Sequence, residues 1–341
     1  MTRLITSEPN IRYLSGFTGS VGIFVIRGNT SILIVDGRYA DQAGSEVKKG
    51  IKVMEAPLYC SLLDTAIDLI KSKKPSTIGY EDDKMDAASF NKLKDRFPWA
   101  KFYSISKELR DRRMIKGSVE IDVIRKAALI ADLTYDCVLR LIKPGMTELE
   151  LSAHIDFLMK TFKASSPAFE TLVSSGKLSA YPHGKPTEKK LGKGDVIVMD
   201  FGARYKGYNS DITRMLSLGA PSKKHRMIYD AVLSAQASAI AKVRHGIAAK
   251  DVDKAARDAL KKKKLEKYFR HGTGHGIGLQ VHEGPRVSLS SKDILKEGMV
   301  ITIEPGVYLP GVGGFRVEDM VLVKKGGCEI LTKSSKELAV L

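Results

Sequence analysis

The sequence contains few cysteines, a single tryptophan and no long apolar run. Its three cysteines, Cys60, Cys137 and Cys328, lie far apart in 341 residues, so neither a disulfide framework nor a cysteine metal site is expected. No apolar segment approaches the roughly 20 residues that cross a bilayer. Residues 1–13 lack the apolar core and the small-residue cleavage site of a signal peptide. These absences predict a cytoplasmic protein with reduced thiols.

Acidic residues are fewer than basic residues, 39 against 56, which gives a formal net charge of +17 and a pI near 9.6. Such a balance is typical of nucleic-acid-binding proteins, but a lysine-rich solvated surface also produces it. The lysines are scattered apart from Lys261–Lys264, and no nucleic-acid-binding motif accompanies them. We therefore favour a solvated surface and expect no nucleic-acid partner.

The chain is longer than one average domain, and its pattern changes near residue 114, so we expect domains at 1–114 and 115–341. The first part mixes strands with helices, which predicts a small α/β domain. Its clearest feature is a β-hairpin whose turn, residues 27–30, carries Gly and Asn. The elements expected in this domain are strands at 21–26, 31–36 and 76–80 and helices at 61–73 and 86–97.

The second domain begins with a long amphipathic helix that Ser118 can cap and that ends at Lys143, before a Pro-Gly pair. Thr147 and Glu150 have the spacing of a capping box, which predicts a second helix after them. Further helices alternate with strands rich in Val and Ile, so this domain too is of mixed α/β (α+β) class. The remaining expected elements are helices at 222–245 and 249–267 and strands at 195–201, 209–216, 299–304 and 315–323.

Two aspartates flank a predicted turn. Asp200 ends an apolar strand and Asp211 opens the next one. A hairpin can bring the two carboxylates side by side, where each raises the pKa of the other unless a cation neutralises them. Two surface aspartates beside a turn are a common arrangement, so this pair alone does not establish a metal site.

Three of the seven histidines, His271, His275 and His282, fall within twelve residues. Glycines recur between them, which excludes the helix of an His-Glu-x-x-His zinc protease and lets the backbone pass close to a metal centre or substrate. Imidazole can both bind metal and transfer protons near neutral pH. A glycine-rich loop with incidental histidines is the alternative, but three imidazoles favour a functional loop.

Two glutamates also lie at positions next to apolar strands. Glu304 ends such a strand before a Pro-Gly turn. Glu318 has apolar neighbours and lies two residues after Arg316, so both side chains would share one face of a strand. Each glutamate alone fits an ordinary strand-end charge or salt bridge.

Together these acidic residues and one histidine predict a dinuclear metal site. Four carboxylates and an imidazole beside hydrophobic sequence are costly to bury without cations, and four negative charges balance two divalent ions. Oxygen ligands with one imidazole suit Mn²⁺, Co²⁺ or Zn²⁺. Two such ions can bridge a water, lower its pKa and stabilise an oxyanion. The predicted ligands are Asp200, Asp211, His275, Glu304 and Glu318.

Four segments around these residues resemble the family of creatinase, aminopeptidase P, prolidase and methionine aminopeptidase: DFGARYKGYNSDITR, HGTGHGIGLQVHEGP, ITIEPGVY and FRVEDMVLV. The resemblance implies a pita-bread catalytic domain. Residues 10–19 and 33–39 resemble the smaller creatinase-like N-terminal domain of prolidase and aminopeptidase P. Methionine aminopeptidases lack such a domain and creatinase lacks the metal ligands, so the proline-specific branch is favoured.

The resemblance implies how the ligands divide between two ions. Asp211 and Glu318 would bridge the ions. Asp200 would complete the shell of one ion, and His275 with Glu304 that of the other. Glu304 would also take part in proton transfer.

The resemblance extends to residues that would act on the substrate. His183 would stabilise the scissile amide or the tetrahedral intermediate, and His282 would contact the substrate near its carbonyl. His271 and Arg316 match active-site residues of the proline-specific branch, and Arg316 could bind the proline carboxylate or brace Glu318. Thr213 would support the ligands from the strand that follows Asp211.

These roles imply a prolidase, a metallopeptidase that hydrolyses the Xaa-Pro bond of dipeptides through a metal-bridging hydroxide, with Mn²⁺ or Co²⁺ favoured over Zn²⁺. Aminopeptidase P activity on longer peptides is the alternative, and the compact chain favours prolidase. A non-catalytic binding protein on the same fold is a remote alternative, because such relatives have lost ligands. The resemblance also implies a homodimer. The native metal and the preferred first residue stay open.

Overall fold

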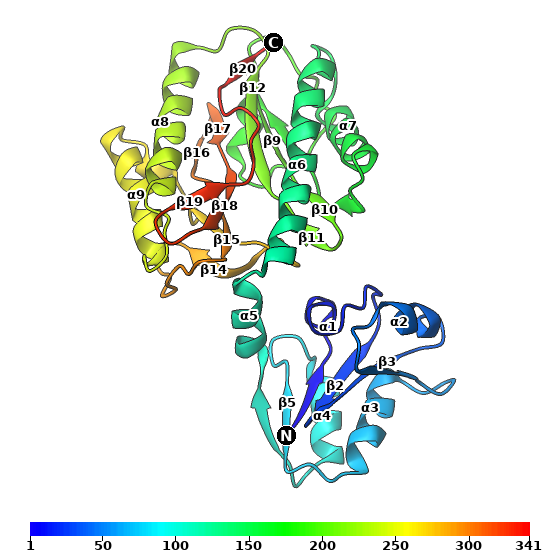
Figure 1. Cartoon of the computed structure of the whole chain (residues 1–341). Coiled ribbons are helices and arrows are strands. Elements are labelled where there is room, and N and C mark those ends of the chain that lie inside the picture. Colours follow the sequence, from blue (N-terminus) through cyan, green and yellow to red (C-terminus); the bar gives the residue numbers. More distant parts are fainter. The chain divides into compact units, whose positions relative to one another are not determined.

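The computed structural model describes all 341 residues and divides the chain into two compact units, Met1–Arg113 and Met114–Leu341. Each unit combines helices with sheets, as Figure 1 shows, so the mixed α/β class is confirmed for both. None of the helices combines the length and the apolar character that crossing a lipid bilayer requires.

The N-terminal unit is a six-stranded sheet in the order β4-β3-β2-β1-β5-β6. The predicted hairpin is confirmed, since β2 and β3 pair antiparallel with Arg27 opposite Thr30. Gly28 in the turn has a φ of +55°, which explains the glycine. The strands are β1 (Thr2–Ile5), β2 (Ile23–Arg27), β3 (Thr30–Val35), β4 (Ile51–Glu55), β5 (Thr77–Tyr80) and β6 (Lys101–Ser104).

Helices cover both faces of this sheet. Successive strand residues point to opposite faces, and both faces of β1 are buried. Leu4 packs in one buried cluster with residues of α3 and α4, while Ile5 packs in another with residues of α1 and α2. The sequence predicted α3, β5 and α4 but not β1, β4, β6 or the remaining helices. The helices are α1 (Glu8–Ser15), α2 (Ala40–Glu46), α3 (Leu62–Lys71), α4 (Ala87–Arg96) and α5 (Ser106–Met114).

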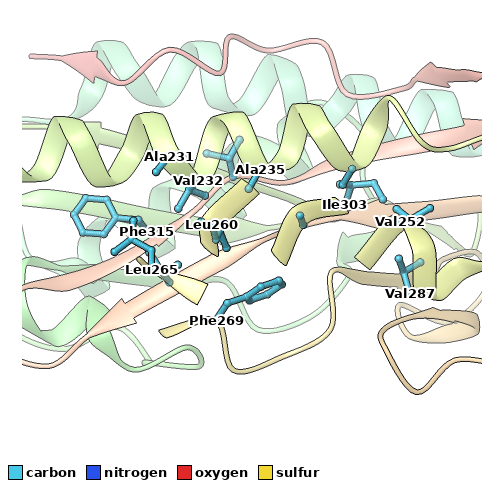
Figure 2. Close-up of a cluster of buried hydrophobic side chains, with 14 of the residues drawn as sticks. Ala231, Val232, Ala235, Val252, Leu260, Leu265, Phe269, Val287, Ile303 and Phe315 are labelled. Carbon is cyan, nitrogen blue, oxygen red and sulfur yellow. The ribbon is translucent and has the colours of Figure 1, made fainter. Parts of the chain in front are cut away.

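The C-terminal unit packs four helices against two main sheets, ordered β20-β12-β9-β8 and β14-β13-β15-β18-β19. Its largest buried cluster joins α8 and α9 to strand residues, and Figure 2 shows Val232 and Leu260 of these helices near Phe315. The helices are α6 (Ser118–Leu141), α7 (Glu148–Thr161), α8 (Lys223–Ile240) and α9 (Ala249–Lys262), with 3-10 helices η1 (Gly176–Ala180) and η2 (Glu266–Tyr268).

The strands of the C-terminal unit also form two small sheets, β11-β10-β7 and β16-β17. The strands are β7 (Ser166–Pro167), β8 (Leu172–Ser175), β9 (Val196–Phe201), β10 (Ala203–Tyr205), β11 (Tyr208–Asn209), β12 (Ile212–Ser217), β13 (Gly274–Gly276), β14 (Glu283–Val287), β15 (Val300–Ile303), β16 (Gly306–Leu309), β17 (Gly313–Arg316), β18 (Asp319–Val323), β19 (Cys328–Ile330) and β20 (Ala339–Val340).

Several predicted element ends are confirmed and others are wrong. The capping box before α7 forms as predicted, with Thr147 Oγ1 accepting from the Glu150 backbone N at 3.0 Å and Glu150 Oε2 accepting from the Thr147 backbone N at 2.7 Å. Gly117, not Ser118, precedes the first turn of α6, and its backbone N donates to Glu120. The predicted helix at 222–245 ends earlier, at Ile240.

The predicted strand at 315–323 is two strands, β17 and β18, in different sheets. Glu318 lies between them, and its backbone N donates to the backbone O of Thr213 at 3.2 Å. Apolar alternation continues through the break, so the pattern did not reveal it. The break places Glu318 beside β12.

A buried ion pair joins the two main sheets at this point. Arg214 of β12 donates to Asp319 of β18 at 2.7 Å, and both side chains are at most 1% exposed. The other carboxylate oxygen of Asp319 accepts from Gln236 and Lys336. Arg214 also donates to the backbone O of Glu318.

Replacing Asp319 with alanine should destabilise the protein by about 3–5 kcal/mol, because it leaves Arg214 buried without its counter-charge. Urea unfolding followed by circular dichroism measures this loss. Asp258→Ala is the control, because it breaks an exposed pair with Lys254 and should leave the midpoint nearly unchanged. Equal midpoints for both variants would contradict a structural role for the buried pair.

Candidate metal centre

The first two predicted ligands lie on neighbouring strands. Asp200 of β9 is opposite Thr213 of β12, and Asp211 precedes β12 by one residue. Asp211 is therefore the diagonal neighbour of Asp200 on the same face of the sheet. Strands β10 and β11 form the connection between them. The predicted hairpin does bring the two carboxylates together.

The next two predicted ligands come from a second pair of strands. His275 lies in β13, and Glu304 directly follows β15, which pairs with β13. His275 Nε2 is 3.4 Å from Glu304 Oε1 and 3.6 Å from Asp211 Oδ2. The imidazole therefore lies between carboxylates that come from different sheets.

Glu318 completes the group. Its carboxylate offers one oxygen within 4.8 Å of ligand atoms from Asp211 and His275. Its other interaction is with Thr213, whose Oγ1 donates to Glu318 Oε2 at 2.9 Å. Asp211, His275 and Glu318 thus form a mutually close set. Glu304 lies beside His275, and the charge of Asp200 acts on Asp211.

Burial and mutual repulsion disfavour ionised carboxylates in this group. Burial raises the pKa of Glu318 well above its ordinary value, and the charges of Asp211, Glu304 and Asp200 raise it further. Burial followed by the charge of Asp200 does the same to Asp211. Burial raises the pKa of Glu304 to about 8, although Arg316 opposes the shift. Nearby dications would remove this penalty.

The orientation of His275 suits a metal ligand. Its Nδ1 is 3.1 Å from the backbone O of Gly276, and because a carbonyl can only accept, Nδ1 must carry the proton. Burial and then His282 lower the pKa of His275 to about 4, so the ring is neutral. The lone pair of Nε2 therefore faces two carboxylates, which is unfavourable unless a cation lies between them.

Two oxygens in the group have no partner within the protein. Asp200 Oδ1 and Glu318 Oε1 are buried and accept no hydrogen bond. Leaving a buried acceptor without a partner costs about 1–3 kcal/mol, and more if the group is charged. A bound cation would remove this cost. Four carboxylates with one imidazole are also the donor set expected for Mn²⁺, Co²⁺ or Zn²⁺. The residues present therefore fit a pair of divalent ions.

The glycine-rich segment 271–282 is irregular, as predicted, except for the short strand β13 at Gly274–Gly276. A Cβ on Gly274 would lie 1.9 Å from the backbone O of Thr302, and one on Gly276 would lie 1.9 Å from that of Gly284. The glycines therefore allow close backbone approach, as predicted, but to the neighbouring strands β15 and β14. This packing fixes His275 beside Glu304.

A chain of hydrogen bonds links Asp200 to the predicted residues Arg316 and His271. Arg316 is 4% exposed, and its guanidinium donates to Asp200 Oδ2, Thr213 Oγ1 and Tyr308 Oη. Tyr308 in turn donates to His271 Nε2 at 3.0 Å, because His271 Nδ1 donates to the backbone O of Gly272. Burial followed by Arg316 lowers the pKa of His271 to about 4.

Sequence reasoning missed Tyr308. The signal was an aromatic residue with a polar tip four positions after Glu304, in a strand that opens after the Pro-Gly turn. Its hydroxyl accepts from Arg316 and donates to His271, so it connects the two side chains. Four of the five N–H groups of Arg316 are committed to protein acceptors, the fourth being the backbone O of Pro182.

The remaining predicted residues, His183 and His282, are exposed. The His282 ring is 4.3 Å from the His275 ring between centroids. Partial burial lowers the pKa of His282, the charge of Asp200 raises it, and His183 lowers it, so both residues are electrostatic neighbours of the site. The loop that carries His282 is anchored at the next residue, where Glu283 accepts from Lys116 at 2.6 Å in a buried ion pair.

Comparison with known proteins matches two family models. Residues 122–325 match metallopeptidase family M24, and residues 2–115 match the creatinase/prolidase N-terminal domain. A Xaa-Pro dipeptidase of Pyrococcus horikoshii is 39% identical over 340 residues, which is 98% of this chain and 93% of that protein.

Solved structures agree with this match along the whole chain. An X-Pro aminopeptidase from Thermotoga maritima is 38% identical, with a TM-score of 0.93 over 100% of this chain and 97% of the other. A Xaa-Pro dipeptidase from Bacillus anthracis is also 38% identical, with a TM-score of 0.95 over 100% and 95% of the two chains.

Removing the metal should lower the melting temperature, because ions that bind only the folded state stabilise it by RT ln(1 + [L]/Kd), about 2.7 kcal/mol at 100 times Kd. We expect Mn²⁺ to raise the melting temperature of the chelator-treated protein but not that of Glu318→Ala. Differential scanning fluorimetry and elemental analysis measure the two effects. Glu329→Ala, which removes an acid paired with Arg125, should bind Mn²⁺ like the unaltered protein; full metal content in Glu318→Ala would refute the site.

Proposed function

Because the chain belongs to metallopeptidase family M24 and carries a creatinase/prolidase N-terminal domain, we propose that it is a dinuclear-metal prolidase that hydrolyses the Xaa-Pro bond of dipeptides. The observation that carries the proposal is the close set of Asp211, His275 and Glu318, with Glu304 also beside His275 Nε2. Glu318 and the neighbouring Asp200 each have one buried oxygen without a protein partner. Relatives named Xaa-Pro dipeptidase, 37% and 39% identical, support the substrate class.

The ions would be held by the five predicted ligands. When bound, two divalent ions supply a water of lowered pKa and polarise the carbonyl under attack. The protein orients these ligands through hydrogen bonds: Thr213 Oγ1 donates to Glu318, the backbone N of His275 donates to Thr302 Oγ1, and the backbone N of Glu304 donates to the backbone O of Thr273. The ligands are Asp200, Asp211, His275, Glu304 and Glu318.

His183 and His282 are proposed to bind the carbonyl oxygen of the residue before proline. Both residues are exposed, unlike the half-buried His271 and His275, so a substrate can reach them. A donor aimed at the oxygen where negative charge develops stabilises the transition state more than the ground state.

Glu304 is proposed to carry the proton to the proline nitrogen. Its carboxylate lies in the site beside His275, and Thr302 Oγ1 donates to Glu304 Oε1 at 3.4 Å. A base that can hold a proton at neutral pH and release it to a leaving amine is what cleavage of this amide needs.

Arg316 is proposed to orient Asp200, a role that differs from the one first expected. Its guanidinium is buried and donates to Asp200, Thr213 and Tyr308. Because four of its five N–H groups already donate to protein acceptors, the proline carboxylate of a dipeptide would have to compete with these bonds. Bracing of a ligand therefore fits the contacts better than substrate binding.

Aminopeptidase P activity on longer peptides is the second candidate. It is favoured by the similarity to the Thermotoga maritima X-Pro aminopeptidase, which is as identical to this chain as the Bacillus anthracis dipeptidase. The two activities share the metal centre and differ in whether a residue may follow proline. A homodimer, a cytoplasmic location and a preference for Mn²⁺ or Co²⁺ stay predictions.

Ala-Pro should be hydrolysed at least tenfold faster than Ala-Pro-Ala at equal concentrations of peptide and of Mn²⁺, because a prolidase site accepts proline only at the carboxyl end. Chromatography of the released alanine measures both rates, and parallel assays with Co²⁺ and Zn²⁺ identify the preferred ion. Ala-Ala serves as the control for proline dependence. Faster cleavage of the tripeptide would establish the aminopeptidase alternative.

Replacing His183 or His282 with alanine should lower kcat about 10²–10³-fold, the usual effect of losing one donor to a developing oxyanion. Metal content should not change, because neither residue is a proposed ligand. Steady-state kinetics with Ala-Pro and elemental analysis test the two parts. His154→Ala, at an exposed position of α7, is the matched control; unchanged kcat in both His183 and His282 variants would remove these roles.

A further inference from the structure

Two charged residues of α9 hold the segment that leads into β13. Asp253 Oδ1 accepts from the backbone N and from Oγ1 of Thr273, both at 2.8 Å. Arg257 donates to the backbone O of Phe269 at 3.1 Å and of His271 at 2.6 Å. The two side chains also pair, with Arg257 Nε 2.7 Å from Asp253 Oδ2. We name Asp253 and Arg257 the α9 clasp.

The α9 clasp is one contact away from two proposed ligands. Thr273, which Asp253 holds, accepts at its backbone O from the backbone N of Glu304 at 2.7 Å. Thr273 is also two residues before His275, whose backbone N donates to Thr302 Oγ1 at 3.1 Å. The backbone of Gly274 packs so closely against Thr302 that a Cβ would lie 1.9 Å from the Thr302 backbone O, so the segment cannot move towards Thr302. A displaced Thr273 would therefore shift His275 and Glu304 relative to one another.

The α9 clasp takes no part in ligation itself. Asp253 is 0% exposed, and both of its oxygens accept from protein donors, in contrast to Asp200 and Glu318. Arg257 also lies over the Phe269 ring, 4.3 Å from its centroid. Together the two side chains bind backbone atoms of residues 269, 271 and 273.

We propose that the α9 clasp positions the metal centre by setting the distance between His275 and Glu304, and thereby the affinity for the ion that these two residues share. The inference rests on the proposed metal site. Residues that orient metal ligands from behind usually contribute about 10–100-fold to metal affinity or activity. Neither clasp residue touches a ligand side chain, so they are positioning residues.

Asp253→Asn tests the inference, because the amide still offers Thr273 an oxygen but gives Arg257 no charged partner. Titration calorimetry of the chelator-treated protein with Mn²⁺ should show one of two binding steps weakened about 10–100-fold and the other unchanged. Hydrogen exchange of residues 269–275 in the metal-free variant should be faster than in the unaltered protein. With Ala-Pro and saturating Mn²⁺, kcat should fall while KM stays within twofold.

Arg257→Lys is the second variant, in case Asp253→Asn does not fold. The lysine ammonium can still pair with Asp253 but cannot bind both backbone carbonyls, so the same step should weaken. Glu81→Gln is the matched control, because Glu81 is a buried carboxylate of the N-terminal unit that accepts from Thr6, Ser7 and Asn10. It should lower the melting temperature and leave both Mn²⁺ steps unchanged.

The outcomes separate the inference from the function on which it rests. If the unaltered protein binds fewer than two Mn²⁺ ions, the proposed function fails. If it binds two, and a folded clasp variant binds both as tightly as the Glu81→Gln control, the positioning role is overturned. A clasp variant with one selectively weakened step supports it.

Discussion

The repulsion among four carboxylates enclosed in one region is the constraint on which the catalytic unit depends. Burial and neighbouring charges raise the pKa of Asp211, Glu304 and Glu318 together. Such a group is unstable as a set of ions unless cations lie among them. The strands that carry these carboxylates must therefore keep them close together against their mutual repulsion. The buried Arg214–Asp319 pair contributes, because Arg214 also donates to the backbone O of Glu318.

Other buried carboxylates of the same chain show what the metal centre lacks. Glu148 is 0% exposed and accepts from Ser175 and Thr187, and Asp253 is satisfied by Thr273 and Arg257. These side chains need no ion, because protein donors surround both oxygens. Asp200 and Glu318 each keep one oxygen unmatched. Within one protein, carboxylates whose two oxygens are hydrogen-bonded therefore differ from these two with an unpartnered oxygen, which are proposed metal ligands.

Much of the proposed site could be predicted from the sequence, because the local pattern places Asp200, Asp211 and Glu304 where predicted strands begin or end. The hairpin of β9 and β12 required only an apolar run, a turn and a second run. The break before Glu318 could not be predicted, because apolar residues continue across it and a contact with Thr213, more than a hundred residues earlier, decides it. Tyr308 and Asp253 were missed because they act through His271 and Thr273, which lie 37 and 20 residues away in other elements.

Histidine illustrates how environment and not residue type assigns a role in this protein. His271 and His275 are enclosed, and burial lowers the pKa of each to about 4, so both rings remain neutral near pH 7. A neutral ring offers one lone pair, which His271 uses to accept from Tyr308 and His275 directs at the carboxylates. His183 and His282 stay exposed beside them. Two rings are therefore held by contacts within the group, while the exposure of the other two suits the substrate contacts proposed for them.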